Sequence, residues 1–108
     1  MAATMFEKIW NRHVIVEDEG ELLLHVDRAL IHEGSSHAFA KLEAQGRAVA
    51  RPRQVFAFND HYVPTAGREK GVAGIAIPEI RNMVLKLQAN TAKHGITLFG
   101  IDDPRQGI

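Results

Sequence analysis

The chain of 108 residues contains no cysteine. This absence excludes disulfide bonds, thiolate zinc sites, a cysteine nucleophile and an iron–sulfur cluster held by thiolates of these residues. The apolar runs are also short, and none approaches the roughly 20 residues that a membrane-spanning helix needs. No basic segment followed by an apolar one marks a secretory signal at the N-terminus. We therefore expect a cytoplasmic protein that has no membrane partner.

The chain also lacks a net charge. Thirteen basic residues balance thirteen acidic ones, so no overall field attracts nucleic acid. Apolar residues make up 45% of the chain and charged residues 24%, which is an ordinary balance for a folded domain. Because the length allows one domain but not two, we expect residues 1–108 to form a single α/β domain.

The first predicted helix lies at the N-terminus. Thr4 and Glu7 stand at the spacing of a capping box, in which each side chain binds a free backbone amide, and this predicts a helix over residues 5–12. Its apolar side chains recur at intervals of three and four, and we expect them to pack in the core. They are Phe6, Ile9 and Trp10.

Two further helices are expected. Ser35 or Ser36 can cap the second helix, which is expected to stop at Gly46. We interpret the serines as caps rather than nucleophiles because no G-x-S-x-G motif surrounds them. Pro78 suits the first turn of the third and longest helix, which ends at Gly95. The apolar stripe of this helix is Ile80, Val84 and Leu87.

Runs rich in β-branched, leucine and aromatic residues predict the strands. They lie at residues 14–16, 22–27, 55–58 and 96–100. The first two are separated by an acidic turn, and residues 22–24 are expected to be buried. Residues 65–77 contain three glycines whose spacing matches neither the dinucleotide fingerprint nor a P-loop, so this segment is expected to be a flexible connection.

The order of these elements predicts the fold class. Strands that alternate with helices are typical of an α/β domain with a small, mostly parallel sheet. Such a sheet is normally covered on both faces, and about three helices are too few for that. We therefore expect an incomplete domain whose open sheet is covered by further residues, by a partner or by a second copy of the chain.

Asp60 and His61 follow the predicted strand at residues 55–58. The carboxyl ends of strands are where α/β sheets usually place ligands. A carboxylate beside an imidazole can also fix the tautomer of the ring and assist proton transfer. The alternative is an aspartate that caps a turn next to a solvent-exposed histidine.

His32 and Glu33 follow an earlier strand, so His32 is expected near His61 if the two strands are neighbours. Together with His25 and His37 these residues supply imidazole and carboxylate groups. None of them stands at a tight metal-ligand spacing such as H-E-x-x-H. We therefore expect no metal site among these residues.

Four segments, read in order, resemble the large subunits of the aconitase and isopropylmalate dehydratase family. They are residues 4–10 (TMFEKIW), 32–33 (HE), 59–65 (NDHYVPT) and 103–108 (DPRQGI). The resemblance covers essentially the whole chain. It implies that residues 1–108 are the N-terminal part of a hydro-lyase large subunit and resemble part of the first domain of the aconitase fold.

The resemblance also implies a chemistry. Enzymes of this family dehydrate and rehydrate a hydroxy-dicarboxylic acid with a [4Fe–4S] cluster that acts as a Lewis acid. It implies that Asp60 and His61 are catalytic, through protonation of the departing hydroxyl, and that His32 binds substrate. The family's cluster ligands lie beyond Ile108, and other residues come from later domains and a small subunit. The isolated chain is therefore expected to be inactive.

Some choices stay open at this stage. Residues 32–36, Asn59 and Tyr62 differ from those of the commonest isopropylmalate enzymes. The substrate is therefore isopropylmalate, as in leucine biosynthesis, or citramalate, dimethylmalate, maleate or homoaconitate. The alternative function is a stand-alone, non-catalytic module that dimerises or binds a partner subunit. A histidine-based metal hydrolase is a third hypothesis.

Overall fold

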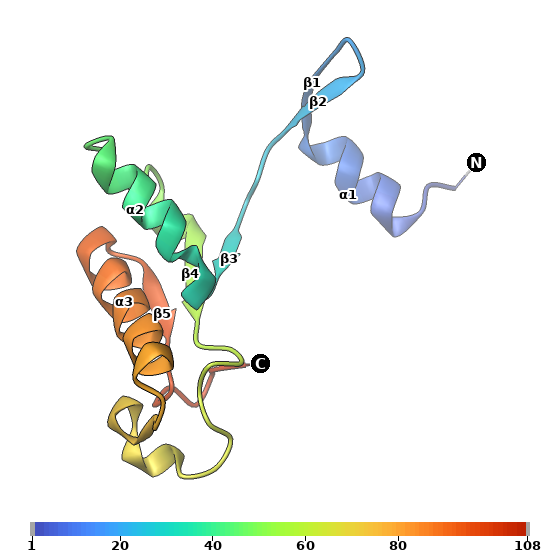
Figure 1. Ribbon diagram of the computed structural model, residues 1–108. Coiled ribbons are helices and arrows are strands. Elements are labelled where there is room, and N and C mark those ends of the chain that lie inside the picture. Colours follow the sequence, from blue (N-terminus) through green and yellow to red (C-terminus); the bar gives the residue numbers. More distant parts are fainter. Residues whose placement is uncertain (1, 108) are drawn as a thin grey trace.

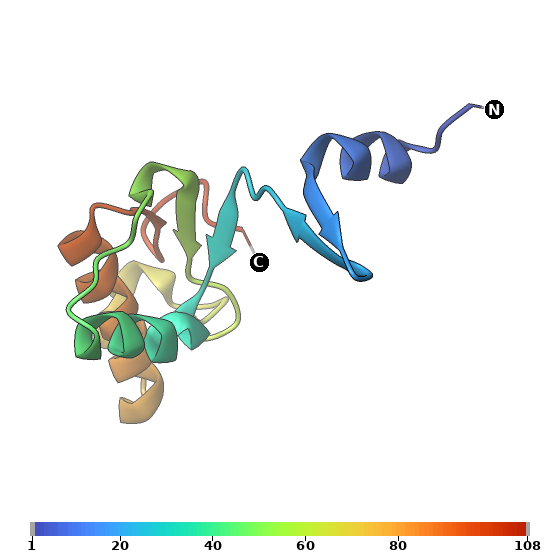
Figure 2. The same ribbon diagram turned by 90° about the horizontal axis from the view of Figure 1, so that it is seen from above.

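The chain folds into an N-terminal arm and an α/β body (Figure 1). The computed structural model describes residues 2–107. The arm contains α1 (Met5–His13), β1 (Val14–Asp18) and β2 (Glu21–Leu24), and the body begins at β3 (Ala29–Ile31). The radius of gyration is 17.5 Å, against about 13 Å for a compact chain of this length. The difference reflects the arm, which extends away from the body (Figure 2).

Local signals explain the arm. The Thr4 hydroxyl accepts a hydrogen bond from the Glu7 amide at 3.2 Å, and the Glu7 carboxylate accepts one from the Thr4 amide at 2.7 Å. The predicted capping box and helix are therefore confirmed. β1 and β2 pair antiparallel. Glu19 and Gly20 join them with φ of 48° and 84°, as a two-residue hairpin turn with positive φ at both positions requires.

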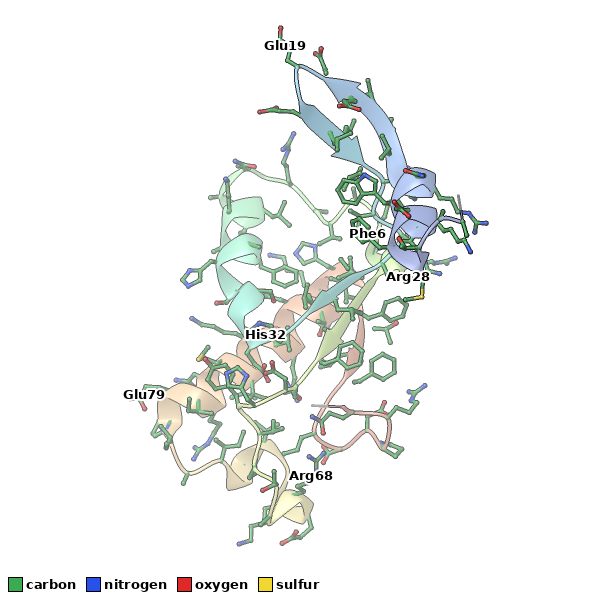
Figure 3. All side chains as sticks on the ribbon, turned by 90° about the vertical axis from the view of Figure 1, so that its right-hand side faces the viewer. Phe6, Glu19, Arg28, His32, Arg68 and Glu79 are labelled. Atoms are coloured by element: carbon green, nitrogen blue, oxygen red, sulfur yellow. The ribbon has the colours of Figure 1, made fainter. Side chains whose placement is uncertain are left out.

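The expected burial of the arm is wrong. α1 has no buried residue, and Phe6, Ile9 and Leu23 are 67%, 53% and 57% exposed. Three of the four β2 residues are exposed as well, although residues 22–24 were expected in the core. The arm projects from the body, and Glu19 at its tip lies far from His32 and Arg68 (Figure 3). Apolar spacing marks one side of an element, but burial needs a second layer against it.

The body is built on the predicted parallel sheet. Its strands lie in the order β3, β4 (Val55–Phe58) and β5 (Thr97–Phe99), and both pairings are parallel. α2 (Ser36–Ala44) and α3 (Pro78–His94) lie side by side on one face of the sheet (Figure 1). The predicted α/β class with three helices is therefore confirmed for the described residues.

Two buried clusters hold the body together. The first lies between the sheet and the two helices and joins Phe39, Ala57, Leu87 and Ile96. The second lies under the loops that follow the strands and joins Val63, Ile75, Val84 and Ile101. Val84 and Leu87 come from the predicted stripe of α3, whose ends at Pro78 and Gly95 are also confirmed; Gly95 has a φ of 70°. Two apolar clusters thus meet on one helix.

The other face of the sheet has no helix over it in the described part of the chain. Ala57 points to the helices, so its neighbours in β4 point the opposite way. There Phe99 lies 6.4 Å from Phe56 and 4.9 Å from Phe58 between ring centroids. Leu30 of β3 is 71% exposed. The expected under-covered sheet is therefore confirmed.

Three local predictions need correction. The strand before His32 is not residues 22–27: β2 ends at Leu24 and the separate three-residue β3 follows after a gap, too short to give a strand pattern. Neither serine caps α2, because the Ser35 hydroxyl donates to the His32 carbonyl instead. The segment 65–77 is more ordered than expected, since it forms η3 (Arg68–Lys70) and η4 (Val72–Gly74) and buries Ile75.

Among the residues described, no helix combines the length and the apolar character needed to cross a membrane.

Candidate functional site

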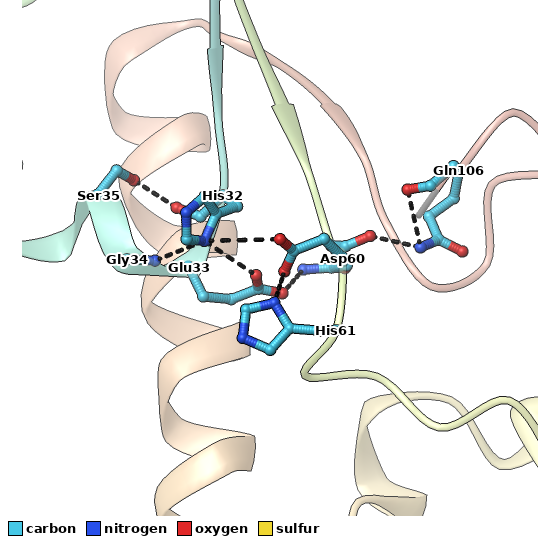
Figure 4. Close-up of polar contacts among 9 residues, drawn as sticks. His32, Glu33, Gly34, Ser35, Asp60, His61 and Gln106 are labelled. Atoms are coloured by element: carbon cyan, nitrogen blue, oxygen red, sulfur yellow. Dashed lines mark hydrogen bonds and ion pairs between the residues drawn. The ribbon is translucent and has the colours of Figure 1, made fainter.

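Two loops meet at the carboxyl edge of the parallel sheet. His32 directly follows β3, and Asn59 and Asp60 directly follow β4, whose register pairs Ile31 with Ala57. Neighbouring parallel strands end at the same edge, so their loops converge there. The rings of His32 and His61 are 6.1 Å apart between centroids. The structure therefore brings all three predicted site residues, His32, Asp60 and His61, into one cluster (Figure 4).

Asp60 lies between the two imidazoles. Its Oδ1 is 2.9 Å from His61 Nδ1, and its Oδ2 is 3.8 Å from His32 Nδ1. The first contact is close but is not a hydrogen bond, and Oδ1 has no hydrogen-bond donor among the described residues. The Tyr62 ring packs 4.1 Å from the His61 ring. Asp60 and Tyr62 together limit the positions that the His61 ring can take.

The backbone selects a tautomer for His32. The Gly34 amide donates to His32 Nδ1 at 3.1 Å, so in the neutral ring Nδ1 is an acceptor and the proton lies on Nε2. The His32 side chain is 49% exposed. Its Nε2–H has no hydrogen-bond acceptor among the residues described here, and it is therefore available to a ligand.

Glu33 and Asn59 form a buried layer beneath this cluster. Glu33 is 1% exposed and Asn59 is fully buried. Asn59 Nδ2 donates to Glu33 Oε1 at 2.7 Å, and its Oδ1 accepts from the Ile101 amide at 3.0 Å. The Gln106 amide donates to the Asn59 carbonyl, and Arg68 donates to Gln106 Oε1 and to the Ile101 carbonyl, each at 2.7 Å. The layer ties the C-terminal turn to the site.

The sequence indicated these supporting residues poorly. Asn59 directly follows the predicted apolar strand at residues 55–58, which is the one available sign of a buried polar residue. The sequence singles out Glu33 only as the neighbour of His32. Gln106 lies in a polar turn and had no signal of its own, because its contacts with Asn59 and Arg68 depend on the way the chain folds back.

The two carboxyl groups differ in their electrostatics. Burial raises the pKa of Glu33, and this effect outweighs the hydrogen bonds from its own backbone and from Asn59. Burial also raises the pKa of Asp60, but the close contact with the His61 ring, the His61 backbone amide and a contact with Glu33 lower it overall. The two pKa values are therefore shifted in opposite directions, so a proton shared by the two carboxyl groups favours Glu33 over Asp60.

A cleft of about 410 Å³ opens beside His61. Its lining is mostly apolar and comes from the loop after β4, from the segment 74–77 and from Ile80 of α3. The lining residues of the first loop are Tyr62, Val63 and Pro64. A small ligand bound in this cleft would place its apolar part against this lining, next to the His61 ring.

The contacts of His32, Glu33 and Asp60 do not identify a metal site. One donor atom each of His32, Glu33 and Asp60 lies within 4.8 Å of the others, but Nδ1 of His32 already accepts a hydrogen bond from the Gly34 amide. The expected absence of a metal stays a prediction. A [4Fe–4S] cluster does not fit the chain's own residues either, because such clusters are held by thiolates and the chain has no cysteine.

Comparisons with known proteins identify the family of this chain. The sequence profile of the aconitase family (aconitate hydratase) matches residues 7–108. The 3-isopropylmalate dehydratase large subunit of Cytophaga hutchinsonii is 40% identical over 111 aligned residues, which cover 100% of this chain and 23% of that protein. No solved structure matches the chain. A profile match over nearly all residues and identity along the whole chain establish that this chain belongs to the aconitase family.

Proposed function

We propose that the chain is part of a hydro-lyase large subunit and supplies acid–base and substrate-binding groups to its active site. The observation that carries the proposal is the convergence of His32, Asp60 and His61 at the carboxyl edge of the sheet. The reaction is the reversible removal of water from a hydroxy-dicarboxylic acid. Isopropylmalate or a close malate derivative is the proposed substrate, because the relative named above acts in that chemistry by its name.

His61 is the proposed proton donor to the departing hydroxyl. As the C–O bond breaks, the proton on the ring would join the hydroxyl oxygen, so that water rather than hydroxide leaves. A positioned acid of this kind typically contributes about 10² to 10⁴ in rate. Asp60 would orient the ring through its contact with Nδ1, leaving Nε2 to face the substrate.

His32 is the proposed substrate-binding group. Its Nε2–H is exposed and directed by the Gly34 amide at the other ring nitrogen. It would donate a hydrogen bond to a carboxylate or hydroxyl oxygen of the substrate. The apolar cleft beside His61 would take an alkyl substituent, which would distinguish a substituted malate from malate itself.

The complete reaction requires residues outside this chain. It spans 23% of the relative's length and has no cysteine, so any [4Fe–4S] cluster depends on ligands elsewhere. We propose that these ligands, later domains and a small subunit complete the site, that the 108 residues alone are inactive, and that the whole protein acts in the cytoplasm.

The test is turnover by the complete large subunit that contains this segment, assembled with its small subunit and supplied with the candidate malate derivatives. His61→Ala and Asp60→Asn should lower kcat by about 10² to 10⁴. His32→Gln should act mainly on KM. His37→Gln, an exposed histidine of α2, is the matched control. Full activity of the His61 and Asp60 variants would overturn the assigned roles.

A second candidate is a non-catalytic module that pairs with another copy or with a partner subunit. The exposed apolar side chains of the arm and the open aromatic face of the sheet favour it. Sedimentation of the 108-residue chain distinguishes the two: a stable dimer, together with a complete subunit that turns over none of the malate derivatives, would favour the module.

A further inference from the structure

Glu33 is an unusual residue to find at full burial. Its side chain has no exposed surface, and a buried carboxylate needs partners for both oxygens. Oε1 has the Asn59 amide, but Oε2 has no hydrogen-bond donor among the described residues. The function proposed above gives Glu33 no role, although it adjoins the site.

A second buried oxygen lacks a donor at the same place. Asp60 Oδ1 is also buried and without a hydrogen bond within residues 2–107. Glu33 and Asp60 each have an oxygen in the group of donor atoms that lie within 4.8 Å of one another, and the two carboxyl groups face each other in Figure 4. Two ionised carboxylates in such a position would repel each other, whereas one shared proton satisfies both oxygens.

The position of the proton follows from the surroundings of the two groups. Asp60 is 30% exposed and lies beside two imidazoles, at 2.9 Å from His61 and 3.8 Å from His32. Glu33 has no exposed surface, and its nearest ring nitrogen, Nδ1 of His32, is 4.0 Å away. The negative charge is better solvated on Asp60, so the proton belongs on Glu33.

Two helices pack on the turn that contains Glu33. η1 (Glu33–Ser35) contacts α2 and α3. The buried residues of those helices carry no titratable group in the described structure. They are Phe39, Val84, Leu87 and Thr91. The titratable groups recorded beside Glu33 in the described structure are Asp60 and His32, at the carboxyl edge of the sheet.

We propose that Glu33 is a positioning residue that stays protonated beneath the site and donates its O–H to Asp60. In this arrangement Asn59 holds Oε1, and the protonated Oε2 holds Asp60 Oδ1. Asp60 then keeps its charge and its place between His32 and His61. The catalytic consequence rests on the proposed function, whereas the protonation state of Glu33 does not.

The direct test is a pH titration of the side-chain carboxyl carbons of the 108-residue chain by NMR. The resonance of Glu33 is expected to remain at its protonated position at neutral pH, where Glu7 of α1, whose pKa is lowered by its hydrogen bonds with Thr4, serves as the ionised reference. A Glu33 carboxyl group that ionises over the same pH range as Glu7 would overturn the proposal. So would a saturable shift of both Glu33 and Asp60 on addition of Zn²⁺ with Glu33 ionised, because a cation would then replace the proton.

Two Glu33 variants with side chains of similar volume distinguish the effect of a hydrogen-bond donor from the effect of packing alone. Glu33→Gln keeps an N–H donor toward Asp60, so the titration of Asp60 should follow the parent protein. Glu33→Met fills the space without a donor, so the Asp60 titration should move to higher pH. Equal effects of the two variants on Asp60 would contradict the proposal. If either variant fails to fold, the titration of the parent chain still decides.

In the complete, active protein the Glu33→Gln and Glu33→Met variants should differ in their catalytic rates. Glu33→Gln should change kcat by less than about threefold, and Glu33→Met should lower it by about tenfold or more, as expected for a lost hydrogen bond to a charged group. The acidic limb of the pH–rate profile should move to higher pH only in Glu33→Met. Absence of turnover would count against the proposed function, whereas the NMR titration judges this inference independently.

Discussion

The arm and the body obey the same local rules but bury their apolar residues very differently. The arm has a capping box, a two-residue turn and an apolar helix face, yet Phe6 is 67% exposed. The body's α3 has a comparable stripe, and there Val84 and Leu87 are 0% and 2% exposed. The comparison teaches that local sequence can specify an element completely without specifying what covers it.

The candidate site lies entirely in the body and not in the arm. All of its groups come from loops of the body, where parallel strands end together. The arm contributes none of the contacts described for the cluster. We therefore expect substitutions in the two regions to have separable effects, and the single tryptophan, Trp10, provides a spectroscopic probe of the arm alone.

The largest difference is expected from truncating one leucine in each region. Leu87→Ala removes a buried side chain from the core cluster of the body and should lower the free energy of unfolding by about 2 to 5 kcal/mol. Leu23→Ala, in the exposed hairpin, should change it by less than about 0.5 kcal/mol. Urea unfolding followed by far-UV circular dichroism measures both. Equal losses would mean that the arm is packed on the body in solution.

A smaller loss is expected from Asn59→Ala. This substitution leaves Glu33 Oε1 and the Ile101 amide without their partner and should cost about 1 to 3 kcal/mol. Asn82→Ala, at an exposed position of α3, is the matched control. Thermal unfolding compares the two variants. A loss for Asn59→Ala no larger than the control's would show that the buried amide layer does not stabilise the body.

A loss of about 1 kcal/mol is expected from removing the cap of α1. Thr4→Ala breaks the capping box, and caps of this kind contribute about 0.5 to 2 kcal/mol. The effect should appear in Trp10 fluorescence and in amide exchange of the arm, and the exchange of α3 should stay unchanged. Parallel changes in both regions would argue that they unfold as one unit.

The smallest effect is a pH dependence confined to the arm. His13 donates one hydrogen bond to Asp27 at 2.5 Å and another to the Ile9 carbonyl, and both raise the pKa of His13 above its ordinary value of 6.5. The stabilisation is therefore complete below pH 6.5 and is lost as the pH rises through the raised folded value. Trp10 fluorescence should follow this change. Asp27→Asn should flatten it, and added salt should weaken it because the pair is exposed.

Sequence reasoning succeeded where short-range chemistry decides the structure. The ends of α3 follow from Pro78 and from Gly95, whose positive φ ends the helix. The convergence of His32 and His61 followed from a general property of parallel strands, namely that their loops leave from one edge. Prediction from the sequence failed for β3, because three residues are too few to show an alternating pattern. It also failed for Ser35, whose hydroxyl donates a hydrogen bond to the His32 carbonyl instead of capping α2.

The sequence by itself determined the three α-helices, the α/β class and the segments in which the candidate site lies, because capping and apolar periodicity act over a few residues. Only the tertiary structure decided which apolar faces are covered and how the site is supported. The contacts of Asn59 with Glu33, Ile101 and Gln106 join residues 26 to 47 positions apart. Whether such distant groups meet depends on how the whole chain packs, and no local pattern encodes it.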